Sequence, residues 1–229
     1  MRTDEKCWGL KASAWIGLWA AAQLCYATST GLNNIPTADT PPDRTVVFQA
    51  FSNQRHDGDD DYVIGLKMGL RPWGQRFEWG VDGRLGEGGS GPAVFQGKYA
   101  FQPWDNLPTF AIGFTNLAVT SEDRERVGEP FKFLVLTQDF KLLRGHAGYG
   151  IQQDNNAAFF GLDKTIQLLG RDLVLRADVI QTNDQHDWLG SIGFLYALHE
   201  HFVVESWVSQ PFDDGSPIFT LKLNFIWKF

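Results

Sequence analysis

Short segments in which apolar and polar residues alternate cover the chain from residue 44 to residue 229. Residues two apart lie on the same face of a β-strand, so each segment predicts a strand with one apolar and one polar face. Turn-forming residues separate the segments at a spacing of about 15 residues. The pattern predicts about 12 strands, over residues 44–53, 61–71, 76–85, 93–102, 108–118, 130–141, 145–153, 157–168, 172–182, 187–197, 201–210 and 218–229.

The alternation is clearest in the last segment. One face carries large apolar residues, namely Phe219, Leu221, Leu223, Phe225, Trp227 and Phe229. The other face carries Thr220, Lys222, Asn224 and Lys228. The apolar face of a soluble β-sandwich rarely holds so many aromatic rings, so this row is expected to lie against lipid.

No apolar run in the body of the chain approaches the roughly 20 residues of a membrane-spanning helix. Strands that cross a membrane must pair every backbone group within the protein, and a closed barrel does so without leaving a free edge. The predicted fold is therefore all-β: a single antiparallel transmembrane β-barrel. Its connections alternate between tight turns and longer, more acidic loops, which places the turns on the periplasmic side of an outer membrane. Tryptophans in or beside the turns, such as Trp73 and Trp104, are expected at the membrane interfaces.

The N-terminal residues have the layout of a secretory signal peptide. Arg2 and Lys6 precede an apolar stretch over residues 8–24, and Cys25 and Ala27 put small residues at positions −3 and −1 of a cut after residue 27. A retained helical anchor is the alternative, and a lipoprotein at Cys25 is disfavoured by the bulky residue before it. We expect residues 1–27 to be removed, residues 28–43 to form a lead-in segment and residues 44–229 to form the barrel.

Both cysteines of the chain, Cys7 and Cys25, lie in the predicted signal peptide, so the exported protein has no thiol chemistry. The formal net charge is −7, and loss of residues 1–27, with three basic and two acidic residues, leaves −8. So acidic a chain is a poor candidate for binding nucleic acid.

Ten charged residues fall on the polar face of the predicted strands. They are Lys67, Arg71, Glu78, Asp82, Arg84, Lys98, Arg176, Asp178, Glu205 and Lys222. An Arg or Lys facing lipid at mid-bilayer costs about 2–4 kcal/mol, so these side chains are predicted to line the lumen. Two interpretations remain open, because a barrel of about 12 strands is intermediate in size. Barrels of about eight strands are filled by side chains, and those of about 16 strands enclose an open channel. The charges either line a narrow polar pathway or pair with one another and plug the barrel.

The C-terminal strand resembles the terminal signature of outer-membrane proteins of Gram-negative bacteria, with a final aromatic residue and a second aromatic two positions earlier. The resemblance implies that Phe225, Trp227 and Phe229 form the signal recognised by the barrel-assembly machinery. It also implies the cell outer membrane as the location, with lipid and lipopolysaccharide around the barrel.

A second resemblance covers only Thr30 to Asp39, which reads Thr-Gly-Leu-Asn-Asn-Ile-Pro-Thr-Ala-Asp. It is similar to the segment before the first barrel strand of the much longer YjbH-like outer-membrane proteins associated with exopolysaccharide production. The resemblance implies a shared way of starting a barrel. Gly31 permits an unusual backbone angle and Pro36 stiffens the chain, which suits a segment folded into or under the barrel mouth.

Other chemistry is weakly indicated. The five histidines, His56, His146, His186, His199 and His201, lie mostly in predicted loops or turns, and the sequence fixes no Ser, His and acid trio, so no catalytic residue is predicted. The acidic run at residues 57–61 lacks the spacing of a known calcium loop and is expected to be a solvated loop. We therefore predict no metal site and no cofactor.

The leading functional hypothesis is a narrow channel or accessory barrel for polar solutes, with saccharides as candidates and a link to exopolysaccharide. A non-conducting structural or surface-interaction barrel with acidic external loops is the alternative. An outer-membrane enzyme is the third hypothesis.

Overall fold

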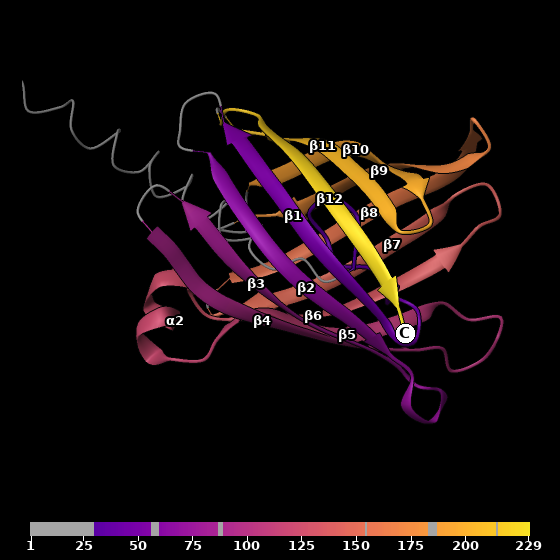
Figure 1. Cartoon of the computed structure of the whole chain (residues 1–229), viewed down its shortest axis with the longest axis horizontal. Helices are drawn as coiled ribbons and strands as arrows, with labels where there is room; N and C mark the ends of the chain where they lie inside the picture. The colour runs from indigo at the N-terminus through magenta and orange to yellow at the C-terminus, as the bar shows by residue number, and fades with distance from the viewer. Residues whose placement is uncertain (1–29, 56–59, 87–88, 154, 183–186, 214) are drawn as a thin grey trace, which may run out of the picture.

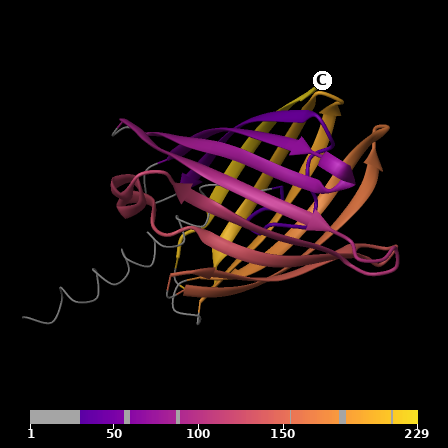
Figure 2. The ribbon, with the colours of Figure 1, turned by 90° about the horizontal axis from the view of Figure 1, so that it is seen from below.

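The computed structural model describes residues 30–55, 60–86, 89–153, 155–182, 187–213 and 215–229. Twelve antiparallel strands form one closed barrel, in which each strand pairs with its neighbours along the chain (Figures 1 and 2). The strands are β1 (Thr45–Arg55), β2 (Asp61–Leu70), β3 (Arg76–Gly86), β4 (Gly89–Phe101), β5 (Thr109–Ala118), β6 (Phe131–Asp139), β7 (Arg144–Gln152), β8 (Asn155–Leu168), β9 (Arg171–Gln181), β10 (Trp188–His199), β11 (Phe202–Pro211) and β12 (Ile218–Lys228).

The barrel is closed by the first and last strands. Antiparallel pairing of β1 with β12 runs from Thr45 opposite Lys228 to Arg55 opposite Ile218. The end of the barrel where β1 begins and β12 ends is called the termini end below; Figure 1 shows the C-terminus there. Closure leaves every strand paired on both sides, so the predicted all-β barrel is confirmed.

The predicted strands match the observed ones closely. The largest difference is in β4, which begins at Gly89 rather than at residue 93. Tight turns join strands at the termini end, and the turn between β8 and β9 shows why they form. Leu169 and Gly170 both have positive φ, of 53° and 76°, as the mirror-image two-residue hairpin turns require.

Helical structure is minor in the part of the chain that the structure describes. A short 3-10 helix, η1 (Pro72–Gly74), follows β2, and α2 (Ser121–Val127) lies in the connection between β5 and β6. Thr120 caps α2 by accepting a hydrogen bond from the Asp123 backbone N–H at 3.0 Å. No helix among these residues is long and apolar enough to cross a membrane.

The outer face of the barrel is apolar. In β12, Phe219, Leu221 and Phe225 are exposed and alternate with buried Thr220 and Lys222. Exposed aliphatic and aromatic side chains continue around the other strands, which is far more apolar surface than a protein in water presents. This face is therefore suited to lipid, as the alternation predicts.

A charged residue on this outer face is expected to prevent stable insertion. Leu134 lies near the middle of β6 between two other exposed side chains, Ile112 and Tyr149. Leu134→Arg should lower the free energy of unfolding in lipid vesicles by about 2–4 kcal/mol. Leu169→Arg, at an exposed turn, is the matched control and should cost less than about 1 kcal/mol. Equal values for both variants would show that β6 does not face lipid at Leu134.

Residues 30–39 lie inside the barrel, where the indigo segment is seen in Figures 1 and 2. Residues 32–38 are all buried. The predicted signal peptide lies outside the described residues, and so does most of the acidic run at residues 57–61. The cleavage after residue 27 therefore stays a prediction.

Candidate functional site

Residues 30–39 form a tight hairpin inside the barrel, here called the lumen hairpin. Gly31 and Pro36 make an antiparallel bridge, and the backbone N–H of Leu32 donates to the carbonyl oxygen of Ile35 at 3.0 Å. A Cβ at Gly31 would lie 2.1 Å from that same Ile35 oxygen, so only glycine fits this turn. Asn33 and Asn34 form the hairpin tip.

Apolar side chains seat the lumen hairpin against one part of the inner wall. Leu32, Ile35 and Ala38 are buried. They form one apolar cluster with inward-facing wall residues from β4, β5, β6, β8, β9 and β10, namely Ala100, Ala111, Phe131, Phe133, Val135, Ala157, Phe159, Ile180 and Leu189. Gly161 of β8 makes room for this contact, because a Cβ there would lie 2.4 Å from Leu32 Cδ1 and 2.7 Å from Ile35 Cδ1.

The hairpin tip is held by three neighbouring strands. The backbone N–H groups of Asn33 and Asn34 both donate to Oδ2 of Asp178 in β9, at 2.8 and 3.3 Å. Asn33 Nδ2 donates to Ser191 Oγ of β10, and Asn34 Nδ2 donates to Ser209 Oγ of β11, each at 2.9 Å. Ser191 also donates to Asp178 at 2.7 Å, which fixes the carboxylate in place. The tip is therefore tied to β9, β10 and β11 by both its backbone and its side chains.

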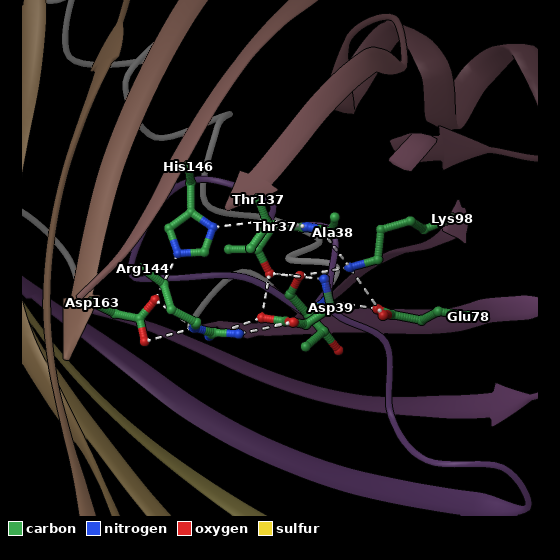
Figure 3. Close-up of polar contacts among 10 residues, drawn as sticks. Thr37, Ala38, Asp39, Glu78, Lys98, Thr137, Arg144, His146 and Asp163 are labelled. Atoms are coloured by element: carbon green, nitrogen blue, oxygen red, sulfur yellow. Dashed lines mark hydrogen bonds and ion pairs between the residues drawn. The ribbon is translucent and has the colours of Figure 1, made fainter. Parts of the chain in front are cut away.

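A buried ion pair holds the base of the hairpin. Lys98 Nζ of β4 lies 3.2 Å from Glu78 Oε2 of β3, and both side chains are fully buried. Lys98 donates to the carbonyl oxygens of Thr30 and Thr37, at 2.6 and 3.0 Å. Glu78 accepts from the Thr30 backbone N–H at 2.7 Å. Figure 3 shows Lys98 between Glu78 and the hairpin. The hairpin backbone therefore binds both members of the ion pair, through two donors of Lys98 and through Oε1 of Glu78.

The last residue of the hairpin binds an arginine. Asp39 accepts two hydrogen bonds from Arg144 of β7, from Nη1 at 3.1 Å and from Nη2 at 3.0 Å (Figure 3). Arg144 Nε also donates to both carboxylate oxygens of Asp163 in β8, at 3.2 Å. Burial raises the pKa of Asp39, but the charge of Arg144 and its hydrogen bonds outweigh burial and hold that pKa below its usual value.

A buried histidine completes this network. His146 Nε2 lies 2.6 Å from Asp163 Oδ1, and His146 Nδ1 lies 2.9 Å from Thr137 Oγ1. Thr137 Oγ1 accepts from the Ala38 backbone N–H at 3.0 Å. The neutral tautomer with its proton on Nε2 satisfies every partner, because Thr137 then donates to Nδ1 and Nε2–H donates to Asp163.

A second polar cluster lies on β1, β2, β3, β9, β11 and β12. Glu205 accepts from Arg176 Nη1 at 2.5 Å and from Asn224 Nδ2 at 2.7 Å, and lies 3.5 Å from Lys222 Nζ. Asp82 accepts from Gln49 Nε2 at 2.9 Å. These six groups therefore find their hydrogen-bond and ion-pair partners within the barrel wall. This part of the wall, with its many amide and charged side chains, is here called the polar wall.

Nine of the ten predicted lumen residues point into the barrel. Glu78 pairs with Lys98, Glu205 pairs with Arg176 and Lys222, and Arg84 pairs with Asp61. Asp82 and Asp178 accept hydrogen bonds from neighbouring side chains, and Lys67 is buried on β2. Arg71 is a correction: it follows the end of β2 in a turn and is exposed, so it lies outside the lumen.

Sequence reasoning missed much of the hairpin site. Asp39, Thr137, Arg144 and Asp163 were not singled out. His146 lies in the predicted strand 145–153 and is buried in β7, but it was given no role. The alternation along β7 could have indicated part of the site, because it puts Arg144 and His146 on the same face of the strand. Phe225, Trp227 and Phe229 are exposed at the end of the chain; their role in assembly stays a prediction.

The lumen is closed to water at the level of its charges. Lys67, Lys98 and Lys222 expose 4%, 3% and 6% of their surface, and Asp82 exposes 1%. Charged side chains in a water-filled channel would be far more accessible. In this conformation the barrel is therefore filled by its own side chains and by the lumen hairpin.

Three solved structures place the fold among porins. The chain matches a KdgM porin over 78% of its own length and 98% of the other chain, with 9% identity and a TM-score of 0.58. It matches a KdgM porin in complex with disordered oligogalacturonate over 79% and 98%, with 9% identity and a TM-score of 0.57. It matches a NanC porin over 80% and 99%, with 11% identity and a TM-score of 0.53. The protein has a porin-like barrel fold.

No protein-family model matches the sequence, and no curated protein is similar to it. At identities of 9% and 11% the solved structures show the shared fold alone.

Proposed function

We propose that this protein is an outer-membrane channel for polar solutes that is closed, in the conformation described, by its own lumen hairpin. The observation that carries the proposal is the difference between the two halves of the inner wall. One part, from β4 to β10, carries the apolar cluster and seats the hairpin through Leu32, Ile35 and Ala38. The polar wall carries charged and amide side chains that bind one another, as Glu205 binds Arg176 and Asn224 and as Asp82 binds Gln49.

The polar wall supplies the groups that a passing polar solute needs. Lys67, Gln49, Asn224 and Lys222 form a row across β2, β1 and β12, in which Gln49 lies directly opposite Asn224 in the pairing register. A solute that leaves water for so narrow a lumen must exchange its hydrogen bonds for new ones. Side chains that both donate and accept, spread along the wall, make that exchange possible.

Opening requires the hairpin to leave its seat, and its contacts are of a kind that can break. The tip is held by four hydrogen bonds to Asp178, Ser191 and Ser209. Hydrogen bonds of this kind contribute about 0.5–1.5 kcal/mol each, and those to charged groups about 1.5–3 kcal/mol. Together these contributions make the closed state more stable than the open one, but they are small enough for the hairpin to leave its seat at times.

The finer parts of the proposal concern cell location and solute. Export through a signal peptide at residues 1–27, insertion by the barrel-assembly machinery through the Phe225, Trp227 and Phe229 signature, and lipopolysaccharide around the barrel all agree with the apolar outer face. A saccharide solute is supported by the KdgM porin in complex with disordered oligogalacturonate and by the exopolysaccharide link of the YjbH-like resemblance.

A non-conducting barrel is the second candidate, and the apolar seat favours it. Leu32 and Ile35 are almost wholly buried against the wall, as the side chains of a permanent core would be. In that case the hairpin is a fixed filler that stabilises the barrel, and the acidic external loops carry the function.

An enzyme is not supported by the one arrangement that resembles a catalytic triad. Thr137, His146 and Asp163 are joined by hydrogen bonds in that order. Thr137 is buried, and its oxygen accepts from the hairpin backbone at Ala38. The geometry fits a structural role that connects the hairpin to the wall, since the hairpin occupies the place that a substrate would need.

A wedge under the hairpin tests the proposal. Gly161→Val puts a side chain where Leu32 and Ile35 now lie, so the hairpin cannot seat and discrete conductance steps should appear in planar bilayers. Gly83→Val is the matched control, because a Cβ at Gly83 meets no atom within 4 Å; it should behave as the unmodified protein does.

A second variant guards against misfolding of the wedge. Leu32→Ala with Ile35→Ala weakens the seat without changing the wall, and it should also increase conductance. If both variants run as folded barrels in heat-modifiability gels and remain silent in bilayers, the channel proposal fails and the non-conducting barrel takes its place.

A further inference from the structure

The contact between Asp39 and Arg144 has the form of a carboxylate bound in a receptor site. The two terminal nitrogens of Arg144 each donate to a different oxygen of Asp39, at 3.1 and 3.0 Å. Two parallel hydrogen bonds of this kind are the geometry in which arginine recognises a free carboxylate. Asp39 comes from the lumen hairpin and not from the wall, so the contact is broken whenever the hairpin leaves.

Arg144 would stay in place after such a departure. Its Nε donates to Asp163 of the neighbouring strand, and Asp163 is in turn held by His146. Asp163 is 1% exposed, whereas the side chains of Arg144 and Asp39 are 36% and 38% exposed. Asp163 of the wall therefore fixes the guanidinium through Nε. The two outer donors, on Nη1 and Nη2, face a region near the termini end that water reaches.

The charge balance also changes when the hairpin leaves. Arg144 is next to one wall carboxylate, Asp163, and one hairpin carboxylate, Asp39. The nearby wall cation Lys98 is paired with Glu78. With Asp39 gone, the charges of Arg144 and Asp163 balance one another, and the two outer N–H groups of Arg144 have lost their acceptors. An anion of matching shape restores both hydrogen bonds.

We propose that Arg144 is a binding site for the carboxylate of an acidic solute, and that Asp39 occupies this site in the closed state as an internal substitute. The inference rests on the proposed channel function, because it names the class of solute that stabilises the open state. A carboxylate-bearing solute, such as an acidic saccharide, competes with Asp39 for Arg144. A neutral solute of the same size has no such advantage.

Removing the internal carboxylate tests the proposal by a binding measurement that does not depend on conductance. D-glucuronate is titrated into the purified full chain by calorimetry, with D-glucose as the neutral counterpart. Asp39→Asn keeps the side-chain shape but leaves the two outer donors of Arg144 without their carboxylate. It should bind glucuronate at least tenfold more tightly than the unmodified protein, in which the tethered Asp39 is present at high effective concentration. Glucose should bind both proteins equally weakly.

Two further variants show whether Arg144 is the receptor. Asp39→Asn combined with Arg144→Gln should lose the gain, and Asp105→Asn, at an exposed turn, should leave the affinity unchanged. Glucuronate binding that is no tighter in Asp39→Asn, or that survives the loss of Arg144 in a folded barrel, overturns the inference. If Asp39→Asn binds glucuronate more tightly but Gly161→Val and the Leu32→Ala, Ile35→Ala variant do not conduct, the Arg144 site is supported and the channel function is not. If those variants conduct but Asp39→Asn binds glucuronate no more tightly, the channel function is supported and the Arg144 site is not.

Discussion

Replacing Lys98 by Gln is expected to lower the free energy of unfolding by about 3–5 kcal/mol, because it leaves the fully buried carboxylate of Glu78 without its counter-ion. The same change removes the donor to the carbonyl oxygens of Thr30 and Thr37, so the base of the lumen hairpin loosens as well. Equilibrium unfolding of the inserted barrel in urea, followed by tryptophan fluorescence in lipid vesicles, measures this loss.

The matched comparison is Lys222→Gln. Glu205, the partner of Lys222, keeps Arg176 at 2.5 Å and Asn224 at 2.7 Å, so it retains a cation after the change. The loss of stability should therefore be clearly smaller than for Lys98→Gln. The double variant Lys98→Gln with Glu78→Gln should recover part of the loss, because it removes the unpaired charge. Similar losses for Lys98→Gln and Lys222→Gln would contradict the assignment of Lys98 as the residue that holds the hairpin.

The barrel itself could be predicted because lipid imposes a simple pattern. Every strand must show apolar residues outward at a period of two, and the turns must interrupt that pattern. The row from Phe219 to Phe229 is a clear case, and its outward residues are exposed as expected. Inward charges such as Lys98 and Asp178 follow from the same rule.

The partners of those charges could not be predicted in the same way. Glu78 lies directly opposite Lys98, and Arg144 directly opposite Asp163. Each pairing depends on strand register, which a difference of a single residue in a turn reverses. Of the ten predicted lumen charges, Lys98 pairs with Glu78, and Glu205 pairs with Lys222 and Arg176, which the sequence did not specify.

The lumen hairpin was the least predictable part. Residues 30–39 have no periodicity of their own, and their partners lie as far away in the sequence as Ser209, 175 residues from Asn34. The glycine that makes room for the hairpin, Gly161, reads in the sequence as an ordinary small residue in a strand. The choice between a pathway and a plug therefore depended on contacts that no local pattern contains. The structure shows a closed lumen, and the open state is what the proposal adds.

A disulfide across the hairpin tip is expected to switch conductance on and off. Asn34 Nδ2 lies 2.9 Å from Ser209 Oγ of β11, so the two side chains meet. A disulfide between cysteines at these positions, its formation checked by thiol titration, would fix the hairpin in its seat. The change also removes one hydrogen bond of the tip, so the reduced form should open more readily than the unmodified protein. The native Cys7 and Cys25 are replaced by Ser to exclude other disulfides. The single variant Asn34→Cys in the same background is the control.

The central claim, that the lumen hairpin closes a channel, is tested most directly by single-channel recording of the Asn34→Cys, Ser209→Cys variant before and after addition of reductant. The account predicts silence in the oxidised form and discrete conductance steps in the reduced form, with no effect of reductant on the single variant. Silence in both redox states of a correctly inserted barrel would show that the hairpin is a permanent filler. Equal conductance in both states would show that the conducting path does not depend on the position of the hairpin. Either result contradicts the claim.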